Sequence, residues 1–288
     1  MDMSHKLKAF FDKDTSTLTY IVYDEKTKDS VLIDSVLNYD PAASRLTYAS
    51  IDQVLDFVEE MSLKVHYVLE THAHADHLTG ASEIKKRIPS IKIGIGKNIT
   101  KVQEVFGNIY NLKDLNTNGV QFDVLLEENK PLKAGTIEIK TIFTPGHTPA
   151  CSSYLIDDML FTGDALFMPD FGTARCDFPG GSAKELYHSV HEKLYKLPDD
   201  TRTFTAHDYQ PNGRELQYKS TIGEHKSRNI QLKASTTEEE FIRFRNERDS
   251  TLTAPRLLLP SIQLNISAGE LPKAEDNESH YLKIPLRK

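Results

Sequence analysis

The sequence predicts an α+β fold, an αββα sandwich in which two β-sheets pack face to face beneath outer helices. Apolar strand-like runs alternate with amphipathic helical patterns in two stretches of the chain, 18–112 and 136–208. Polar turns that carry histidine or aspartate follow several of these runs, and α/β proteins tend to bind ligands at such positions. With 288 residues, 39% of them hydrophobic, the chain can bury a sizeable core.

The first stretch begins with a predicted β-hairpin. LTYIVYD (18–24) and SVLIDSV (30–36) are rich in β-branched and aromatic residues and flank the polar turn EKTKD. Ser50 and Gln53 have capping-box spacing and predict the start of a helix. The apolar residues of this helix recur at helical spacing, at Ile51, Val54, Val58 and Met61. KVHYVLETH (64–72) is predicted to be a strand.

The later elements continue this alternation. They are, in order, a helix at 81–89, a strand at 91–96, a helix or helix plus loop at 99–112, strands at 136–144, 152–158 and 159–165, and a short strand at 201–208. Ser182 and Glu185 form a second capping-box pattern, and the amphipathic helix that they begin continues to residue 194.

The chain divides into a predicted main domain, residues 1–225, and a C-terminal segment, residues 226–288, that packs on it. Within this segment EEEFIRFRNERD (238–249) is predicted to be a charged surface helix. RLLLPSIQLNI (256–266) is predicted to be an apolar loop interrupted by proline.

Composition and sequence patterns argue against nucleic-acid binding and against a membrane-spanning segment. The net charge of -7 argues against nucleic-acid binding, which needs a concentrated positive surface. No apolar run approaches the ~20 residues of a membrane span, and the N-terminus lacks a signal core. Cys151 and Cys176 are the only cysteines, and Cys151 lies in an apolar context typical of a buried thiol. We expect a cytoplasmic protein, and a homodimer stays open.

Four metal-ligating side chains are crowded into THAHADHLTG (71–80). His72, His74, Asp76 and His77 form the pattern H-x-H-x-D-H directly after a predicted strand. Isolated histidines in polar loops usually do nothing but contact water. A cluster with a carboxylate at a strand end instead indicates a metal site, because imidazole and carboxylate are common metal ligands.

Other strand ends supply further candidates for the same site. His147 lies in TPGHTPA, Asp164 in FTGDALF and His207 in TAHDYQ, each at the end of a predicted strand. Each one alone is weak evidence, whereas four such ends in one chain predict a shared metal centre. The histidines on the predicted helix or in polar flanks are expected to be structural or solvated: His5, His188, His191, His225 and His280.

The motifs THAHADH, TPGHT, TGDAL and AHDY, in this order, resemble the metallo-β-lactamase superfamily over residues ~15 to 225. The resemblance implies two β-sheets flanked by helices, with the metal at one edge, and makes 1–225 the catalytic domain. Two glutathione-linked branches are similar to this chain. Glyoxalase II enzymes hydrolyse thioesters with two metals, and persulfide dioxygenases hold one iron.

Details of the motifs favour the persulfide dioxygenase branch. The last motif is AHDY, where glyoxalase II typically has a GHEY type of sequence, and TPGHTPACSSYLI lacks the further histidine that glyoxalase II often carries. RCDF (175–178) also resembles the dioxygenase segment. The loop 167–181 looks longer than in mitochondrial-type dioxygenases and resembles a bacterial subgroup of lactamase-like hydrolases.

The resemblance implies that His72, His147 and Asp164 hold one Fe(II) per chain. Two histidines and one carboxylate are also the facial triad of non-haem iron(II) oxygenases, which supports the assignment independently. The remaining candidates either orient these ligands by hydrogen bonds or bind a second metal: His74, Asp76, His77 and His207. In the second case the cofactor would be two Zn(II).

The implied reaction is oxidation of glutathione persulfide, or a related small persulfide, by dioxygen to sulfite and thiol. The alternative is a dinuclear zinc hydrolase of a thioester or lactone, and a non-catalytic sensor is disfavoured by the complete ligand set. Arg175 is predicted to bind a carboxylate of the thiol carrier, or else to form a salt bridge with Asp170 or Asp177. Tyr209 is predicted to be catalytic by hydrogen-bonding the substrate, or else to be a core aromatic.

Overall fold

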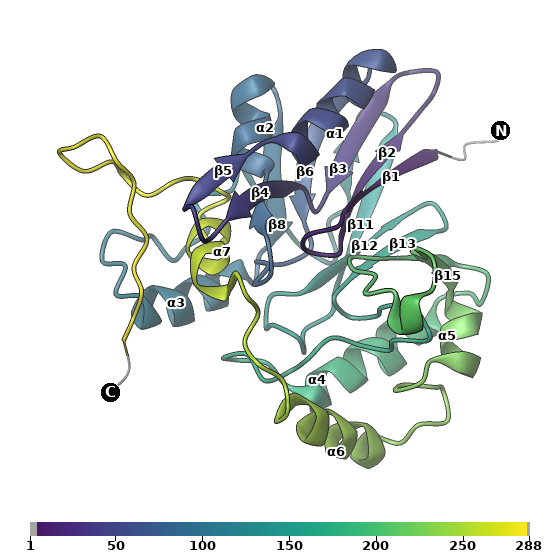
Figure 1. Ribbon diagram of the computed structural model, residues 1–288. Coiled ribbons are helices and arrows are strands. Elements are labelled where there is room, and N and C mark those ends of the chain that lie inside the picture. The colour runs from purple at the N-terminus through teal and green to yellow at the C-terminus, as the bar shows by residue number, and fades with distance from the viewer. Residues whose placement is uncertain (1–4, 287–288) are drawn as a thin grey trace.

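The computed structural model describes residues 5–286 as two β-sheets between two layers of helices (Figure 1). The first sheet contains, in spatial order, β1 (Lys6–Asp12), β2 (Thr17–Tyr23), β3 (Asp29–Ile33), β6 (Lys64–Glu70), β8 (Lys92–Gly96) and β9 (Val124–Leu126). The second contains β10 (Leu132–Ala134), β11 (Ile137–Phe143), β12 (Ser152–Ile156), β13 (Met159–Gly163), β14 (Arg202–Thr205) and β15 (Lys219–Thr221). The predicted αββα sandwich is confirmed.

The helices form two groups on opposite outer faces. Those that share a core with the first sheet are α1 (Ala49–Glu60), α2 (Ala81–Arg87), α3 (Ile99–Ile109) and α7 (Leu258–Asn265). Those below the second sheet in Figure 1 are α4 (Ala183–His188), α5 (Ile222–Arg228) and α6 (Glu238–Asp249). A small third sheet of β5 (Arg45–Thr47), β4 (Val36–Asp40) and β7 (Leu78–Thr79) completes the first half.

Strand β2 shows how the layers are built from the sequence. Leu18, Tyr20 and Val22 belong to the core between the two sheets, whereas Ile21 and Tyr23 belong to the core beneath the first group of helices. Alternate side chains of a strand point to opposite faces of the sheet. Because β2 has apolar residues directed to both faces, it is buried on both sides, and every residue of β2 is buried.

The helix starts agree only in part with the sequence patterns. Ser182 caps α4, because its hydroxyl accepts a hydrogen bond from the Glu185 N–H at 3.2 Å. The predicted cap at Ser50 is wrong. Helix α1 begins at Ala49, and the Ser50 hydroxyl donates instead to Asp12 Oδ1 at 3.1 Å, which ties the helix to β1. The helix from Ala183 also changes to a π-helical turn at Ser189–Lys193.

The apolar segment 256–266 is a helix and not the predicted loop. Pro260 falls in the first turn of α7, where backbone N–H groups have no partner within the helix, so the proline costs no hydrogen bond. Strand β1 was not predicted either. It lies at the edge of the first sheet and alternates charged with apolar residues, so its apolar signal is weak.

The C-terminal segment contributes to both outer cores. Ile262 and Leu264 of α7 pack with the first half of the chain, and Phe241 of α6 packs beneath the second sheet. The division of the chain at residue 225 stays a prediction.

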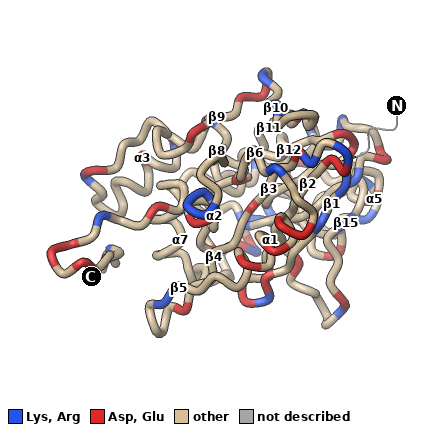
Figure 2. Tube along the Cα trace, turned by 90° about the horizontal axis from the view of Figure 1, so that it is seen from above, with Lys and Arg blue, Asp and Glu red and all other residues tan. Residues whose placement is uncertain are grey.

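Two helices of opposite charge lie side by side on the surface. Viewed from above, the acidic α1 lies beside the basic α2 (Figure 2), and Arg87 of α2 pairs with Asp52 of α1.

Cys151 and Cys176 are both buried and free, and burial raises the pKa of Cys151 to about 12. No helix in the described part of the chain combines the length and apolar character that a membrane span requires.

Asn265, at the end of α7, holds the histidine-rich loop. Its amide nitrogen donates to the carbonyls of His74 and His77, each at 2.8 Å, and its amide oxygen accepts from the Thr79 N–H at 2.9 Å. Asn265 is only 3% exposed, so water cannot replace these bonds without a structural change.

We expect Asn265→Ala to lower the free energy of unfolding by about 2–4 kcal/mol, because it leaves three buried backbone groups without partners. Urea unfolding of the purified protein measures the change. Asn246→Ala, on the exposed face of α6, is the control and should change stability by less than about 0.5 kcal/mol. Equal stability of the two variants would show that Asn265 does not hold the loop.

Candidate metal centre

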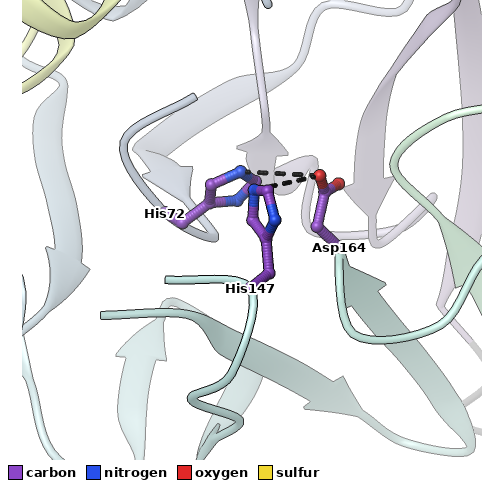
Figure 3. Close-up of side chains that lie close together, drawn as sticks. All are labelled: His72, His147 and Asp164. Carbon is purple, nitrogen blue, oxygen red and sulfur yellow. Dashed lines mark ion pairs between the residues drawn. The ribbon is translucent and has the colours of Figure 1, made fainter. Parts of the chain in front are cut away.

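The predicted ligand residues meet at one end of the sandwich, although they come from distant parts of the chain. His72 follows β6, His147 follows β11, Asp164 follows β13 and His207 follows β14. Figure 3 shows His72, His147 and Asp164 pointing toward one another. All seven predicted candidates lie in this region, and the two groups described below contain six of them.

The first group is His72, His147 and Asp164. His72 Nε2 and His147 Nε2 lie 3.8 and 3.4 Å from Asp164 Oδ2, and the donor atoms all lie within 4.8 Å of one another. All three side chains are buried. The other ring nitrogen of His147, Nδ1, donates to the Arg175 carbonyl at 2.7 Å, which leaves Nε2 free to bind a metal.

Burial favours the neutral form of His72, which is the form that binds metals. Burial and the neighbouring imidazoles, His74 first among them, lower the pKa of His72 well below its usual value. Its Nε2 lone pair is therefore available at neutral pH.

The second group is His74, Asp76 and His207. His207 Nε2 lies 3.3 Å from Asp76 Oδ2 and 3.5 Å from Asp164 Oδ1. The Asp164 carboxylate thus presents one oxygen to each group. His77 belongs to neither group in the described residues, and burial lowers its pKa to about 3.

Two buried carboxylates that the sequence analysis missed fix the orientation of His74. Its Nε2 lies 3.0 Å from Asp34 Oδ1 and 3.3 Å from Glu70 Oε2, so Nδ1 is turned away from them and has no partner among residues 5–286. Burial alone would lower the pKa of His74, but Asp34 and Glu70 outweigh burial and raise it well above its usual value. Asp34 did carry a sequence signal, since it follows the apolar strand β3.

Glycines allow the turns around the site to approach other elements closely. Gly146, before His147, has a φ of +147°, and a Cβ there would lie 2.3 Å from the Leu186 Cβ of α4. Gly163, before Asp164, has a φ of +52°, and a Cβ there would lie 2.8 Å from Thr71 Oγ1. Both positions require glycine, which explains the glycines of TPGHT and TGDAL.

Unpartnered buried atoms test whether this donor set fits a metal. Six of the seven candidates have at least one buried nitrogen or oxygen without a hydrogen-bond partner in the described structure: His72, His74, Asp76, His77, Asp164 and His207. A buried polar atom without a partner costs about 1–3 kcal/mol. So many of them in one place fit a bound cation, and the residues present can hold one metal in the first group and a second in the other.

A cavity of about 750 Å³ opens onto His147, Asp164 and Asp76. Tyr209 lines it, is 44% exposed, and stacks on His207 with ring centroids 5.7 Å apart. Arg175 also lines it, but its guanidinium forms paired hydrogen bonds with Asp177 at 2.6 and 2.7 Å. The salt-bridge alternative for Arg175 is therefore what the structure contains, formed with Asp177; Asp170 pairs with Arg214.

Comparisons with known proteins agree with this architecture. Residues 13–207 match the family model of the metallo-beta-lactamase superfamily. The chain is 45% identical to Glyoxylase B2 of Dictyostelium discoideum, over 99% of this chain and 98% of that protein. It is 31% identical to the human mitochondrial persulfide dioxygenase ETHE1, over 91% and 88%.

A crystal structure of ETHE1 from Myxococcus xanthus superimposes with a TM-score of 0.74 and 30% identity, covering 92% of this chain and 100% of that one. The resemblance that the sequence motifs indicated is thus confirmed at the level of the superfamily. Both the match along the sequence and the shared fold lead to one conclusion: this chain belongs to the metallo-beta-lactamase superfamily, whose fold together with these His and Asp clusters indicates a metal cofactor.

Proposed function

We propose that this protein is an iron-dependent persulfide dioxygenase. It would oxidise glutathione persulfide, or a related low-molecular-weight persulfide, with dioxygen and water to sulfite and the free thiol. The observation that carries the proposal is that His72, His147 and Asp164 form a three-donor group of their own. Two imidazoles and one carboxylate are the ligand set of non-haem iron oxygenases.

Two relatives named as persulfide dioxygenases or ETHE1, each about 30% identical to this chain, support the iron reaction. The chain is 31% identical to the human persulfide dioxygenase and 30% identical to the bacterial ETHE1 structure. The cavity is lined by His147 and Asp164, so a substrate that enters it would come close to two of the three residues that would hold the iron.

The proposed roles of the chain's own residues follow from their contacts. His72, His147 and Asp164 would hold iron(II), which supplies the redox chemistry for the reaction of dioxygen with a sulfur anion. The Arg175 carbonyl fixes the ring of His147. Phe178, whose ring lies 5.1 Å from that of His147, and Phe167 would give the substrate an apolar surface to pack against in the cavity. Tyr209 would donate a hydrogen bond from its hydroxyl to the bound persulfide.

A dinuclear zinc hydrolase of a thioester or lactone is the second candidate. The group of His74, Asp76 and His207, with unpartnered atoms on each residue, favours it. So does the 45% identity to a protein named Glyoxylase B2. In that reaction a metal-activated water would attack a carbonyl carbon.

Metal content separates the two candidates. Purified without added metal, the protein should contain about one iron per chain and consume dioxygen when glutathione persulfide is added, because a single facial triad binds a single iron. Elemental analysis and an oxygen electrode make the two measurements. Two zinc ions per chain, together with hydrolysis of a glutathione thioester and no oxygen uptake, would establish the hydrolase.

Substitutions distinguish ligands from the residues that orient them. Asp164→Ala should lose iron and activity together, whereas His74→Ala should retain iron with affinity reduced by ~10–100-fold, as is typical when a ligand-orienting residue is removed. Asp200→Ala, at an exposed position, is the control for iron lost during purification. Thermal unfolding confirms that each variant is folded. Complete iron loss from both Asp164→Ala and His74→Ala would make His74 a ligand.

Removing the Tyr209 hydroxyl tests its proposed catalytic role. Tyr209→Phe should lower kcat for glutathione persulfide by about 2- to 10-fold, the effect of one lost hydrogen bond, while iron content stays unchanged. Tyr281→Phe, at an exposed site that does not line the cavity, is the matched control. An unchanged kcat in Tyr209→Phe would leave the ring with only a packing role against His207 and Phe171.

A further inference from the structure

The cavity extends well beyond the metal ligands. Its lining includes His147 and Asp164 and also residues of the segment from Phe244 to Arg256, which comprises the end of α6 and the chain that follows it. A volume of about 750 Å³ lies within the range of sites that enclose whole small molecules. A persulfide group and dioxygen would fill only a part of it, so the remaining space is available to the rest of the substrate.

Four arginines line this cavity, and only two have carboxylate partners. Arg175 pairs with Asp177, and Arg245 pairs with Asp249. Arg248 and Arg256 are exposed and form no ion pair within residues 5–286. Both belong to the segment from Phe244 to Arg256 and line the cavity, so they present two positive charges to whatever enters it.

Arg245 adds a third, buried guanidinium to the lining of this cavity. It is only 2% exposed, and its terminal nitrogens bond to Asp249, to the Thr173 carbonyl and to Gln231 Oε1. Its Nε–H has no acceptor in the described structure. A buried N–H without a partner is costly, and Arg245 lines the same cavity as the two unpaired arginines.

Arg175 contributes to this wall by bracing it. Besides its paired bonds to Asp177, it donates through Nη1 to the Thr253 carbonyl at 2.6 Å. All three nitrogens of its guanidinium are therefore engaged, so the carboxylate of a carrier would have to displace Asp177 or Thr253. Arg248 and Arg256, on the segment that Arg175 braces, are therefore better placed than Arg175 to bind a carboxylate of the thiol carrier.

Apolar side chains lie beside these charges. Ile230 is 64% exposed and Phe244 is 38% exposed, and both line the cavity together with Leu252. Exposed apolar residues next to guanidinium groups suit a flexible molecule with hydrocarbon segments between anionic groups.

We propose that Arg248 and Arg256 form an anion-binding site for the thiol that carries the persulfide. The ligand chemistry is a small thiol with two or more negative charges distant from its sulfur, either carboxylates, as in glutathione, or phosphates, as in coenzyme A. The inference rests on the proposed function and adds to it the part of the substrate that the protein recognises.

Charge-removing substitutions test this site in the iron-loaded protein. The variants are Arg248→Gln, Arg256→Gln and the double variant, and the control is Arg243→Gln, an exposed arginine of α6 that does not line the cavity. Oxygen uptake is measured with glutathione persulfide, coenzyme A persulfide and inorganic hydrogen disulfide. Calorimetry measures binding of the unreactive S-methyl thioethers of glutathione and coenzyme A, so it does not depend on catalysis.

Each single substitution should raise KM for the preferred carrier persulfide about 3- to 10-fold, and the double substitution more, with kcat little changed. The Kd of the matching thioether should rise in parallel, and salt should weaken binding to the unsubstituted protein. Kinetics with inorganic hydrogen disulfide and with Arg243→Gln should match those of the unsubstituted protein. Whichever thioether depends on the arginines identifies carboxylate or phosphate as the anion.

Two results would overturn parts of this picture separately. If oxygen uptake is normal but Arg248→Gln and Arg256→Gln behave like Arg243→Gln, the anion site is wrong and the dioxygenase proposal stands. If no persulfide supports oxygen uptake but thioether binding still depends on the arginines, the anion site stands and the dioxygenase proposal fails.

Discussion

The structure depends on the packing of seven imidazole and carboxylate side chains, six of them buried, at one end of a β-sandwich. Such groups are costly to remove from water unless their charges and lone pairs find partners. Here several of the partners are missing from the protein itself, because atoms such as His72 Nε2 and Asp164 Oδ1 have none among the described residues. A bound cation would satisfy them together, and its binding would then count toward the stability of the fold.

The surrounding protein fixes the orientation of these side chains but does not provide hydrogen-bond partners for their inward-facing atoms. Backbone carbonyls and buried carboxylates engage the nitrogens that face away from the centre, as the Arg175 carbonyl does for His147 and as Asp34 and Glu70 do for His74. Each ring is thereby fixed with its other nitrogen directed inward. These outer contacts therefore set the orientation of the candidate ligands.

The sequence predicted the layered fold and the clustering of the seven candidate residues because both leave local signals. Strand and helix periodicity identified most elements, and the ligand residues lie in short motifs at strand ends. What it missed depends on contacts between distant segments. Ser50 was expected to cap its helix, but Asp12 lies close enough in the fold to accept a hydrogen bond from its hydroxyl. Arg248 and Arg256 are ordinary surface residues of a charged segment until the fold places them beside the cavity.

Asn265 connects the order of synthesis to the assembly of the centre. Its bonds to the His74 and His77 carbonyls span 191 and 188 residues of sequence, and they fix a loop that leaves the ribosome long before α7 does. Contacts of such long separation form late, because the intervening chain must first be ordered. During synthesis the loop therefore lacks its hydrogen bonds to Asn265. In that state its histidines would be exposed to cellular metal ions and could chelate them without a fixed geometry. Only the complete chain would offer the geometry that selects among those ions.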